Sequence, residues 1–277
     1  MRLRRIIVAM LALAVNACTS QEDRRSDQEN SAPRVVSLDY CADQYVLKFV
    51  DRSQIAALSP DAEASFSYMR REAHGLPKVR PRAEDILILK PDIVVRSYGG
   101  GPTISRFLDR VGVKVVQIGY ASDLSSVETI ILETAAQLDA TKEGERTVQR
   151  MKDRLAALPE KPARKTLYMT SKGAAAGTRT LIDDLMTQAG LENFDRRAGW
   201  GVLPLERLAY EKPDLVATAY FETSDLVSDI WTPSRHPVAK RTLRDTPRVD
   251  IAGALTACSG WFLLDAVERM AHGPDQP

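Results

Sequence analysis

The sequence predicts an α/β protein with two Rossmann-like lobes that are joined by a single long helix and enclose a ligand cleft. Two observations lead to this fold class. Short apolar strands alternate with helical segments over most of the chain, and one helix-strand unit occurs twice, at 84–95 and again at 206–217. Alternation of this kind indicates βαβ units and a mostly parallel sheet. Two similar units suggest two similar lobes with something held between them.

The repeated unit begins with a glutamate, Glu84 in the first copy and Glu206 in the second, 122 residues apart (206 minus 84). In each copy a short helical segment ends before the tripeptide Lys-Pro-Asp. Proline cannot continue a helix and disfavours helical backbone at the residue before it. The β-branched apolar run that follows is typical of a buried parallel strand.

The first 32 residues predict export. Three arginines precede an apolar run of about ten residues, which is far shorter than the roughly 20 residues of a membrane span. This pattern is typical of a signal peptide, here residues 1–18. Cys18 follows Leu-Ala-Val-Asn-Ala, which resembles a bacterial lipobox and predicts acylation of Cys18; ordinary cleavage near Ala17 is the alternative. Residues 19–32 are charged and nearly free of apolar side chains, as in a disordered tether.

The N-terminal lobe is expected at 33–140. Its predicted strands are 34–38, 55–58, 93–95 and 113–118, and its predicted helices include 42–50, 104–111 and 127–138. The Gly-Gly-Gly-Pro run at 99–102 predicts a loop.

The connecting helix is expected within 141–160. Residues 143–158 are strongly polar, but Val148, Met151, Leu155 and Leu158 recur at helical spacing, which predicts an amphipathic helix of about four turns. One interpretation is an ordinary surface helix. The other is a helix that bridges the lobes, because a new α/β unit begins directly after it.

The C-terminal lobe is expected at 161–277. The sequence predicts a strand at 166–169, a Gly/Ala-rich loop at 172–178, a helix at 180–189, irregular chain at 224–242, a strand at 249–251 and a helix at 260–272.

Charge and composition exclude several classes of protein. The net charge of +1 and the lack of a long basic run give no reason to expect a nucleic-acid partner. His74, His236 and His272 are widely spaced and there is no Cys-x-x-Cys, so we expect no metal site. Cys41 and Cys258 each follow a strand and precede a helix. In an exported protein they can form a disulfide, and two separate thiols are the alternative.

Several segments together resemble a known family. These are the opening run Arg34–Leu38, the unit at 84–95, and Trp200 followed six residues later by Glu206 and then by Lys-Pro-Asp. They are similar to the periplasmic substrate-binding proteins of ABC importers for iron-siderophores, haem and cobalamin, from Arg34 to about residue 271. The resemblance implies a periplasmic, non-enzymatic and monomeric solute-binding protein.

The family's function gives specific expectations. Such a protein captures a ferric siderophore or cobalamin, or alternatively haem, as a transported metal chelate, with no intrinsic cofactor. It delivers this ligand to an ABC permease dimer in the inner membrane. In the relatives one glutamate in each lobe docks onto permease arginines, and these positions fall on Glu84 and Glu206. A glutamate in the first turn of a helix is also favoured by the helix dipole alone.

Ligand contacts are expected where strands of open α/β sheets end. This rule selects Tyr40, Arg96, Tyr98 and Tyr220, while Trp200 matches a ligand-contacting tryptophan of the vitamin B12-binding relative. The other predicted ligand residues lie in irregular segments, and they are Tyr68, Trp231 and Arg235, with Trp261 as a further possible wall. Aromatic walls suit large flat ligands and arginines suit anions. Core packing is the alternative for each aromatic, and a solvated loop is the alternative for Arg235.

The loop at 96–98 bears on the ligand. The vitamin B12-binding relative carries a tryptophan at the position of Ser97, so this sequence departs from it there. Arg96 and Tyr98 suit a catecholate or carboxylate iron chelate, and haem relatives use Tyr or His as an iron ligand, which makes Tyr40 or Tyr98 a candidate.

Three rival interpretations are weaker. An exported hydrolase is disfavoured because the chain has no Gly-x-Ser-x-Gly elbow and no histidine near an obvious nucleophile. Binding of bare zinc or manganese needs several His and carboxylate ligands together. A receptor module without a transporter differs from the expected protein only in its partner.

Overall fold

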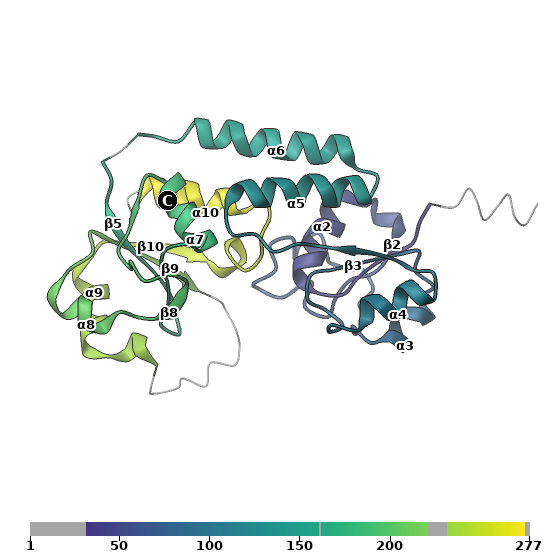
Figure 1. Cartoon of the computed structure of the whole chain (residues 1–277), viewed down its shortest axis with the longest axis horizontal. Coiled ribbons are helices and arrows are strands. Elements are labelled where there is room, and N and C mark those ends of the chain that lie inside the picture. Colours follow the sequence, from purple (N-terminus) through teal and green to yellow (C-terminus); the bar gives the residue numbers. More distant parts are fainter. Residues whose placement is uncertain (1–31, 161, 221–231, 275–277) are drawn as a thin grey trace, which may run out of the picture.

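Two α/β lobes lie side by side in the computed structural model of this chain, and helices span both of them along one side (Figure 1). The structure describes residues 32–160, 162–220 and 232–274. The predicted signal peptide, Cys18 and nearly all of the tether, together with Trp231, lie outside the described residues.

The N-terminal lobe contains a parallel sheet of four strands in the order β2-β1-β3-β4. The strands are β1 (Val35–Ser37), β2 (Ile55–Ala57), β3 (Ile93–Arg96) and β4 (Lys114–Gln117). β1 and β3 are central neighbours, and Ser37 pairs with Val95 at their carboxyl ends. The loops that follow these two strands therefore meet at one edge of the sheet.

Four helices cover the two faces of this sheet. α2 (Tyr40–Phe49) and α5 (Leu124–Gln137) pack on one face, and α3 (Ala83–Ile88) and α4 (Ile104–Arg110) pack on the other. α3 ends as predicted before Lys-Pro-Asp. Its last turn is followed by Lys90 with a positive φ of 47°, a conformation that cannot extend a helix.

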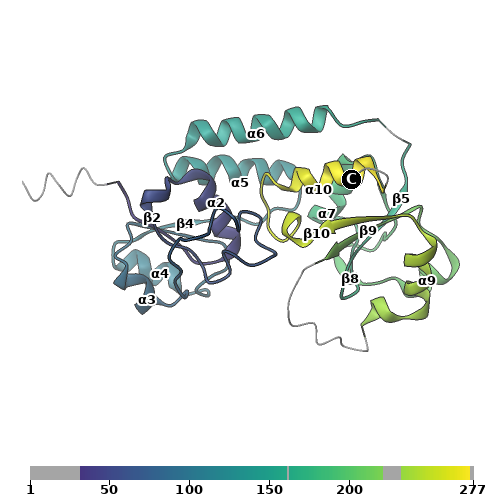
Figure 2. The same ribbon diagram turned by 180° about the vertical axis from the view of Figure 1, so that it is seen from behind.

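The connecting helix is α6 (Thr141–Ala156), which lies over α5 and reaches the second lobe (Figure 2). Its first turn is tied to the N-terminal lobe by an ion pair between Lys48 and Glu143 at 2.9 Å. Its last turn is tied to the other lobe, where Arg154 contacts Asp265 at 2.6 Å and Glu268 at 2.7 Å. One buried apolar cluster continues from the N-terminal lobe through α6 into the C-terminal lobe. The two lobes therefore share part of their core.

The C-terminal lobe contains a mixed sheet in the order β10-β9-β5-β6-β8, with β7 beside β5. Its strands are β5 (Lys165–Thr170), β6 (Ala174–Ala176), β7 (Glu192–Asn193), β8 (Trp200–Val202), β9 (Leu215–Tyr220) and β10 (Arg248–Ala252). Its helices are α7 (Leu181–Gln188), α8 (Leu205–Tyr210), α9 (Pro237–Asp245) and α10 (Leu263–His272). β6 and β8 run antiparallel and form an edge, whereas β5, β7, β9 and β10 are parallel.

Two predictions for this lobe were wrong. The segment 172–178 is not only a loop, because its alanines form β6 between β5 and β8. Alanine and glycine are poor strand formers, so only the neighbouring strands fix this conformation. The segment expected to be irregular up to residue 242 includes most of α9. Pro237 stands at the first helical position, where its missing N–H and fixed φ are tolerated.

No helix among residues 32–160, 162–220 and 232–274 is both long and apolar enough to cross a membrane.

Candidate functional site

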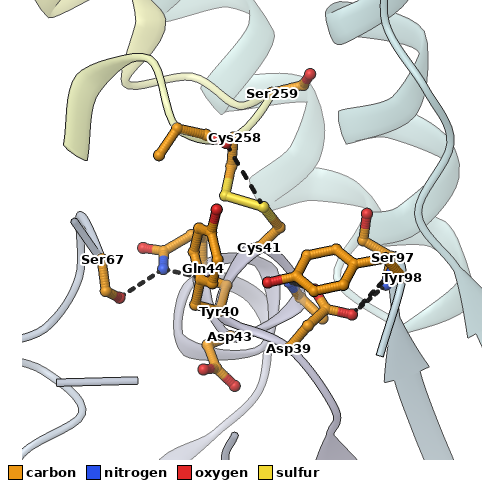
Figure 3. Close-up of a disulfide and its surroundings, with 12 residues drawn as sticks. Asp39, Tyr40, Cys41, Asp43, Gln44, Ser67, Ser97, Tyr98, Cys258 and Ser259 are labelled. Carbon is orange, nitrogen blue, oxygen red and sulfur yellow. Dashed lines mark hydrogen bonds between the residues drawn. A yellow bond between two sulfur atoms is a disulfide. The ribbon is translucent and has the colours of Figure 1, made fainter. Parts of the chain in front are cut away.

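The first turn of α2 holds the loop that follows β3. Asp39 is buried and caps the helix, with one carboxylate oxygen accepting from the Ala42 N–H at 2.9 Å. Its other oxygen accepts from the N–H groups of Ser97, Tyr98 and Gly99 at 2.7, 3.0 and 2.8 Å. A carboxylate that receives several N–H groups is a strong, charge-assisted anchor. Asp39 therefore fixes the backbone of Tyr98 beside Tyr40 (Figure 3).

The next polar residues of α2 hold two more loops. Asp43 is buried and accepts from the N–H and the hydroxyl of Ser59 at 3.0 and 2.6 Å. Gln44 donates to the Ser67 hydroxyl at 2.8 Å and accepts from the Met69 N–H at 2.7 Å. Burial raises the pKa of Asp43 to about 6, although the hydrogen bonds from its serine partners oppose that shift. The start of α2 thus positions three loops, at Ser59, at 67–69 and at 97–99.

Tyr40 and Tyr98 form an aromatic pair on this framework. Their ring centroids are 5.8 Å apart in an edge-to-face arrangement, and Phe66 packs edge-on against Tyr40 at 4.8 Å. Burial raises the pKa of both tyrosines, and a hydrogen bond from Tyr98 opposes the shift at Tyr40. The Tyr40 oxygen is therefore the acceptor of the pair, and this hydrogen bond offsets part of the rise in its pKa.

A cavity of about 330 Å³ lies between the lobes next to this pair. It is lined by side chains from both lobes, namely Ser65, Phe66, Arg70, Tyr220, residues 250–255 and Arg269. Phe66 belongs both to the cavity wall and to the tyrosine cluster. Phe66 therefore links the cavity to the tyrosine pair, and Arg70 and Arg269 are also among the lining residues.

A disulfide bond joins the two lobes where they meet. Cys41 and Cys258 form a disulfide with a Cα–Cα distance of 5.4 Å across 217 residues of sequence (Figure 3). Beside it, the Tyr45 hydroxyl donates to the Ser259 carbonyl at 3.0 Å. The bridge closes the seam within one residue of Tyr40, so the lobes are held together at the site itself.

A family model described as "Periplasmic binding protein" matches residues 36–226. The chain belongs to the periplasmic binding protein family. Comparison with curated protein sequences finds no match.

Solved periplasmic binding proteins share the fold of this chain. The periplasmic haem-binding protein HutB of Vibrio cholerae is 21% identical, with a TM-score of 0.67 over 87% of this chain and 98% of that one. A periplasmic haem-binding protein from Pseudomonas aeruginosa is 21% identical, with a TM-score of 0.64 over 88% and 93%. The periplasmic vitamin B12-binding protein BtuF of Vibrio cholerae is 17% identical, with a TM-score of 0.59 over 87% and 96%.

In this periplasmic binding protein, several predicted ligand residues lie at the strand ends as expected. Tyr40, Tyr98 and Tyr220 follow or end their strands, and Tyr220 lines the cavity between the lobes. Arg96 is only 7% exposed and donates to the Ser105 hydroxyl at 2.9 Å. No carboxylate of the described residues pairs with Arg96, and its Nε has no partner there. An unpaired buried cation is costly, so this side chain favours an anion nearby.

Other predicted residues have different surroundings. The Tyr68 hydroxyl donates to Asp265 at 3.0 Å and its ring stacks on Phe262 at 4.7 Å, which makes it a contact between the lobes. Trp261 packs into the core against Tyr45. Trp200 lies in β8 against Tyr168, and Arg235 is exposed at the end of the short 3-10 helix Pro233–Arg235 that precedes α9.

Sequence reasoning missed the residues that build the site. Phe66 and Arg70 line the cavity, and Asp43 and Gln44 hold its loops. The one available signal is the Asp-Gln pair inside the buried face of α2, where two polar residues imply specific buried partners. No cluster of three or more His, Cys, Asp or Glu suited to a metal ion occurs in the part of the chain that the structure describes.

Proposed function

We propose that this periplasmic binding protein captures a ferric chelate in the cleft between its lobes, with haem as the favoured ligand, and delivers it unchanged to an ABC permease dimer. The observation that carries the ligand class is the Tyr40–Tyr98 pair. Tyrosine oxygen is an established axial ligand of haem iron. Burial raises the pKa of Tyr40, and the hydrogen bond from Tyr98 offsets part of that rise, which helps the oxygen to act as an iron ligand.

The arginines support an anionic chelate. Arg70 borders the cavity between the lobes, and Arg96 is buried without a carboxylate partner among the described residues. A guanidinium pairs well with a carboxylate in a two-point contact. Haem propionates and the acidic groups of a ferric siderophore both offer such anions.

Cobalamin is the second candidate. Trp200 is 53% exposed, and its ring is free to stack on a large flat ligand. The exposed edge strand β8 carries this side chain. The solved structure of a vitamin B12-binding protein with the same fold adds support.

Ligand titration tests the proposal. Purified protein is titrated with haemin, a ferric tris-catecholate and cyanocobalamin, and binding is followed by absorbance. We expect haemin to bind tightly with a tyrosinate-type spectrum, and Tyr40→Phe to weaken binding at least tenfold and to change that spectrum. Tyr210→Phe is the matched control, because Tyr210 is fully exposed on α8. Tight binding of cyanocobalamin alone would replace haem with the second candidate.

Delivery to the permease is proposed through Glu84 and Glu206. Both carboxylates are exposed and have no ion pair among the described residues, while nearby charges are paired, as in Arg80–Asp85 and Arg207–Glu211. An unpaired carboxylate on each lobe is available to an arginine of the partner. The double variant Glu84→Arg, Glu206→Arg should keep ligand affinity and lose transport in reconstituted vesicles. Transport at the wild-type rate contradicts this assignment.

Cys18 is the proposed site of lipid attachment. The Cys18→Ser variant should move the exported protein from the membrane fraction to the soluble periplasmic fraction. Equal distribution of variant and wild type would favour ordinary cleavage near Ala17.

A further inference from the structure

An exposed apolar side chain follows the glutamate of each repeated unit by one helical turn. Ile88 stands four residues after Glu84 on α3, and Tyr210 stands four residues after Glu206 on α8. Residues at this spacing share one face of a helix. Ile88 is 77% exposed and Tyr210 is 92% exposed, and among the described large apolar side chains only Tyr120 is comparable.

Neither Ile88 nor Tyr210 contributes to the buried core of its lobe. The core of each lobe is served by other residues of the same helices, Ile86 on α3 and Leu208 on α8, which are buried. A single exposed apolar residue needs no explanation in a soluble protein. An explanation is needed when one recurs at the same position of both units, each beside a glutamate that has no ion pair among the described residues.

Both helices lie on the same side of the molecule. In Figure 1, α3 and α4 of one lobe and α8 and α9 of the other lie on the side away from α6, and Figure 2 shows the same for α3, α4 and α9. A hollow of about 620 Å³ adjoins Glu206, and its wall includes the apolar residues Val202 and Leu203. A single large partner can therefore contact the Glu84–Ile88 surface of α3 and the Glu206–Tyr210 surface of α8 at the same time.

We infer that Ile88 and Tyr210 are the apolar anchors of a docking surface in two parts, each made of one glutamate and one apolar side chain. The partner that fits is a symmetric dimer that presents the same surface twice, an arginine or lysine beside an apolar contact. This inference rests on the proposed delivery to a permease dimer. It adds two apolar residues that supply binding energy, Ile88 and Tyr210, to the two glutamates that supply charge.

The two kinds of residue have different physical signatures. An ion pair at an exposed interface is screened by salt and chiefly steers association and register. Burial of an aromatic or aliphatic anchor is insensitive to salt and commonly dominates the binding energy of an interface. The anchors should therefore govern affinity at high salt, and the glutamates should matter most at low salt.

The experiment measures binding of the labelled protein to right-side-out inner-membrane vesicles of the source organism, at low and high salt. All samples carry Cys18→Ser, so that no acyl chain holds the protein on the membrane. The double variant Ile88→Ser, Tyr210→Ser should bind about tenfold more weakly or worse at both salt concentrations. Its matched partner Ile88→Leu, Tyr210→Phe should bind within about twofold of wild type, since it keeps the apolar surface.

A third variant separates this inference from the proposed function. Glu84→Ala, Glu206→Ala should weaken binding at low salt, with a smaller effect at high salt. If this variant loses binding while Ile88→Ser, Tyr210→Ser binds like wild type, delivery through the glutamates stands and the apolar anchors are refuted. If neither variant changes binding, the docking assignment fails together with the anchors. Haemin affinity and circular dichroism, measured on every variant, should match wild type because all four side chains are exposed.

Discussion

The edges of the two sheets that face each other across the cleft are held by different chemistry. In the N-terminal lobe, buried carboxylates and an amide on α2 collect the loops, and Asp39 alone receives four N–H groups. In the C-terminal lobe, the disulfide at Cys258 holds the loop after β10, and two other described contacts near the corresponding edge are between neutral groups. The Ser171 N–H donates to the Ala219 carbonyl at 3.2 Å, and the Tyr168 hydroxyl donates to the Thr256 hydroxyl at 3.1 Å.

This difference indicates that the two edges take different parts in binding the ligand. Charge-assisted hydrogen bonds are about twice as strong as neutral ones, so the N-terminal edge is the more rigid and presents Tyr40 and Tyr98 in fixed positions. The two neutral contacts named for the described C-terminal residues are individually weaker, so we expect this edge to be the more adaptable wall. We expect the ligand to be recognised mainly by the N-terminal lobe, and four predictions test this comparison.

The largest effect is expected from the bond that ties the two edges together. The Cys41→Ser, Cys258→Ser variant should lose about 4–5 kcal/mol of unfolding free energy, because the bridge closes a loop of more than 200 residues in the unfolded chain. Urea unfolding followed by circular dichroism measures this loss. Two free thiols in the denatured, unreduced wild-type protein would show that the bridge does not form.

The second prediction removes the main anchor of the N-terminal edge. Asp39→Ala should cost about 3 kcal/mol, since it loses a helix cap and leaves the N–H groups of the 97–99 loop unpaired. It should also weaken haemin binding by more than tenfold. The control is Asp123→Ala, which removes the cap of α5 but holds no loop of the site, and should cost only about 1 kcal/mol. Equal costs and equal haemin affinities in the two variants contradict the special role of Asp39.

The third prediction concerns the pH dependence of the unfolding free energy, to which the buried Asp43 of the N-terminal edge contributes. Asp43 has a pKa of about 6 in the folded protein, above its ordinary value of 3.8, so the folded state binds the proton more tightly. Its contribution to stability is therefore most favourable below pH 4 and falls as the pH rises to about 6, by about 2–3 kcal/mol in total. The Asp43→Asn variant should lack this decline when the unfolding free energy of both proteins is measured from pH 4 to 7. Parallel curves for the two proteins would exclude Asp43 as its source.

The smallest effects compare single hydroxyl groups on the two edges. Tyr98→Phe should weaken haemin binding by about five- to tenfold, because it removes the hydrogen bond to Tyr40. Tyr220→Phe should change binding by about twofold or less, since its side chain lines the adaptable wall. A larger loss for Tyr220→Phe would reverse the comparison between the lobes.

The tertiary structure alone decided how the predicted residues are used. Asp39 and the loop at 97–99 are separated by about 58 residues, and Tyr68 meets Asp265 across 197 residues. No local pattern distinguishes a tyrosine that packs between the lobes from one that faces the cleft. Tyr68 and Tyr98 both stand in irregular segments rich in small and polar residues, and only their distant partners separate them.

The sequence by itself determined the α/β class, the two lobes and the family. The class and the lobes follow from local properties, namely the period of apolar residues, the helix stop at Lys-Pro-Asp and its recurrence after 122 residues, while the family follows from the resemblance of particular segments to known members. Propensity and periodicity act over a few neighbouring residues, so they are legible in a single chain. The site, the strand β6 and the placement of each aromatic depend on contacts between segments far apart in sequence. Such contacts exist only once the two sheets have packed against each other, which is why the fold and the strand-end positions of Tyr40, Tyr98 and Tyr220 could be predicted and the residues that complete the site could not.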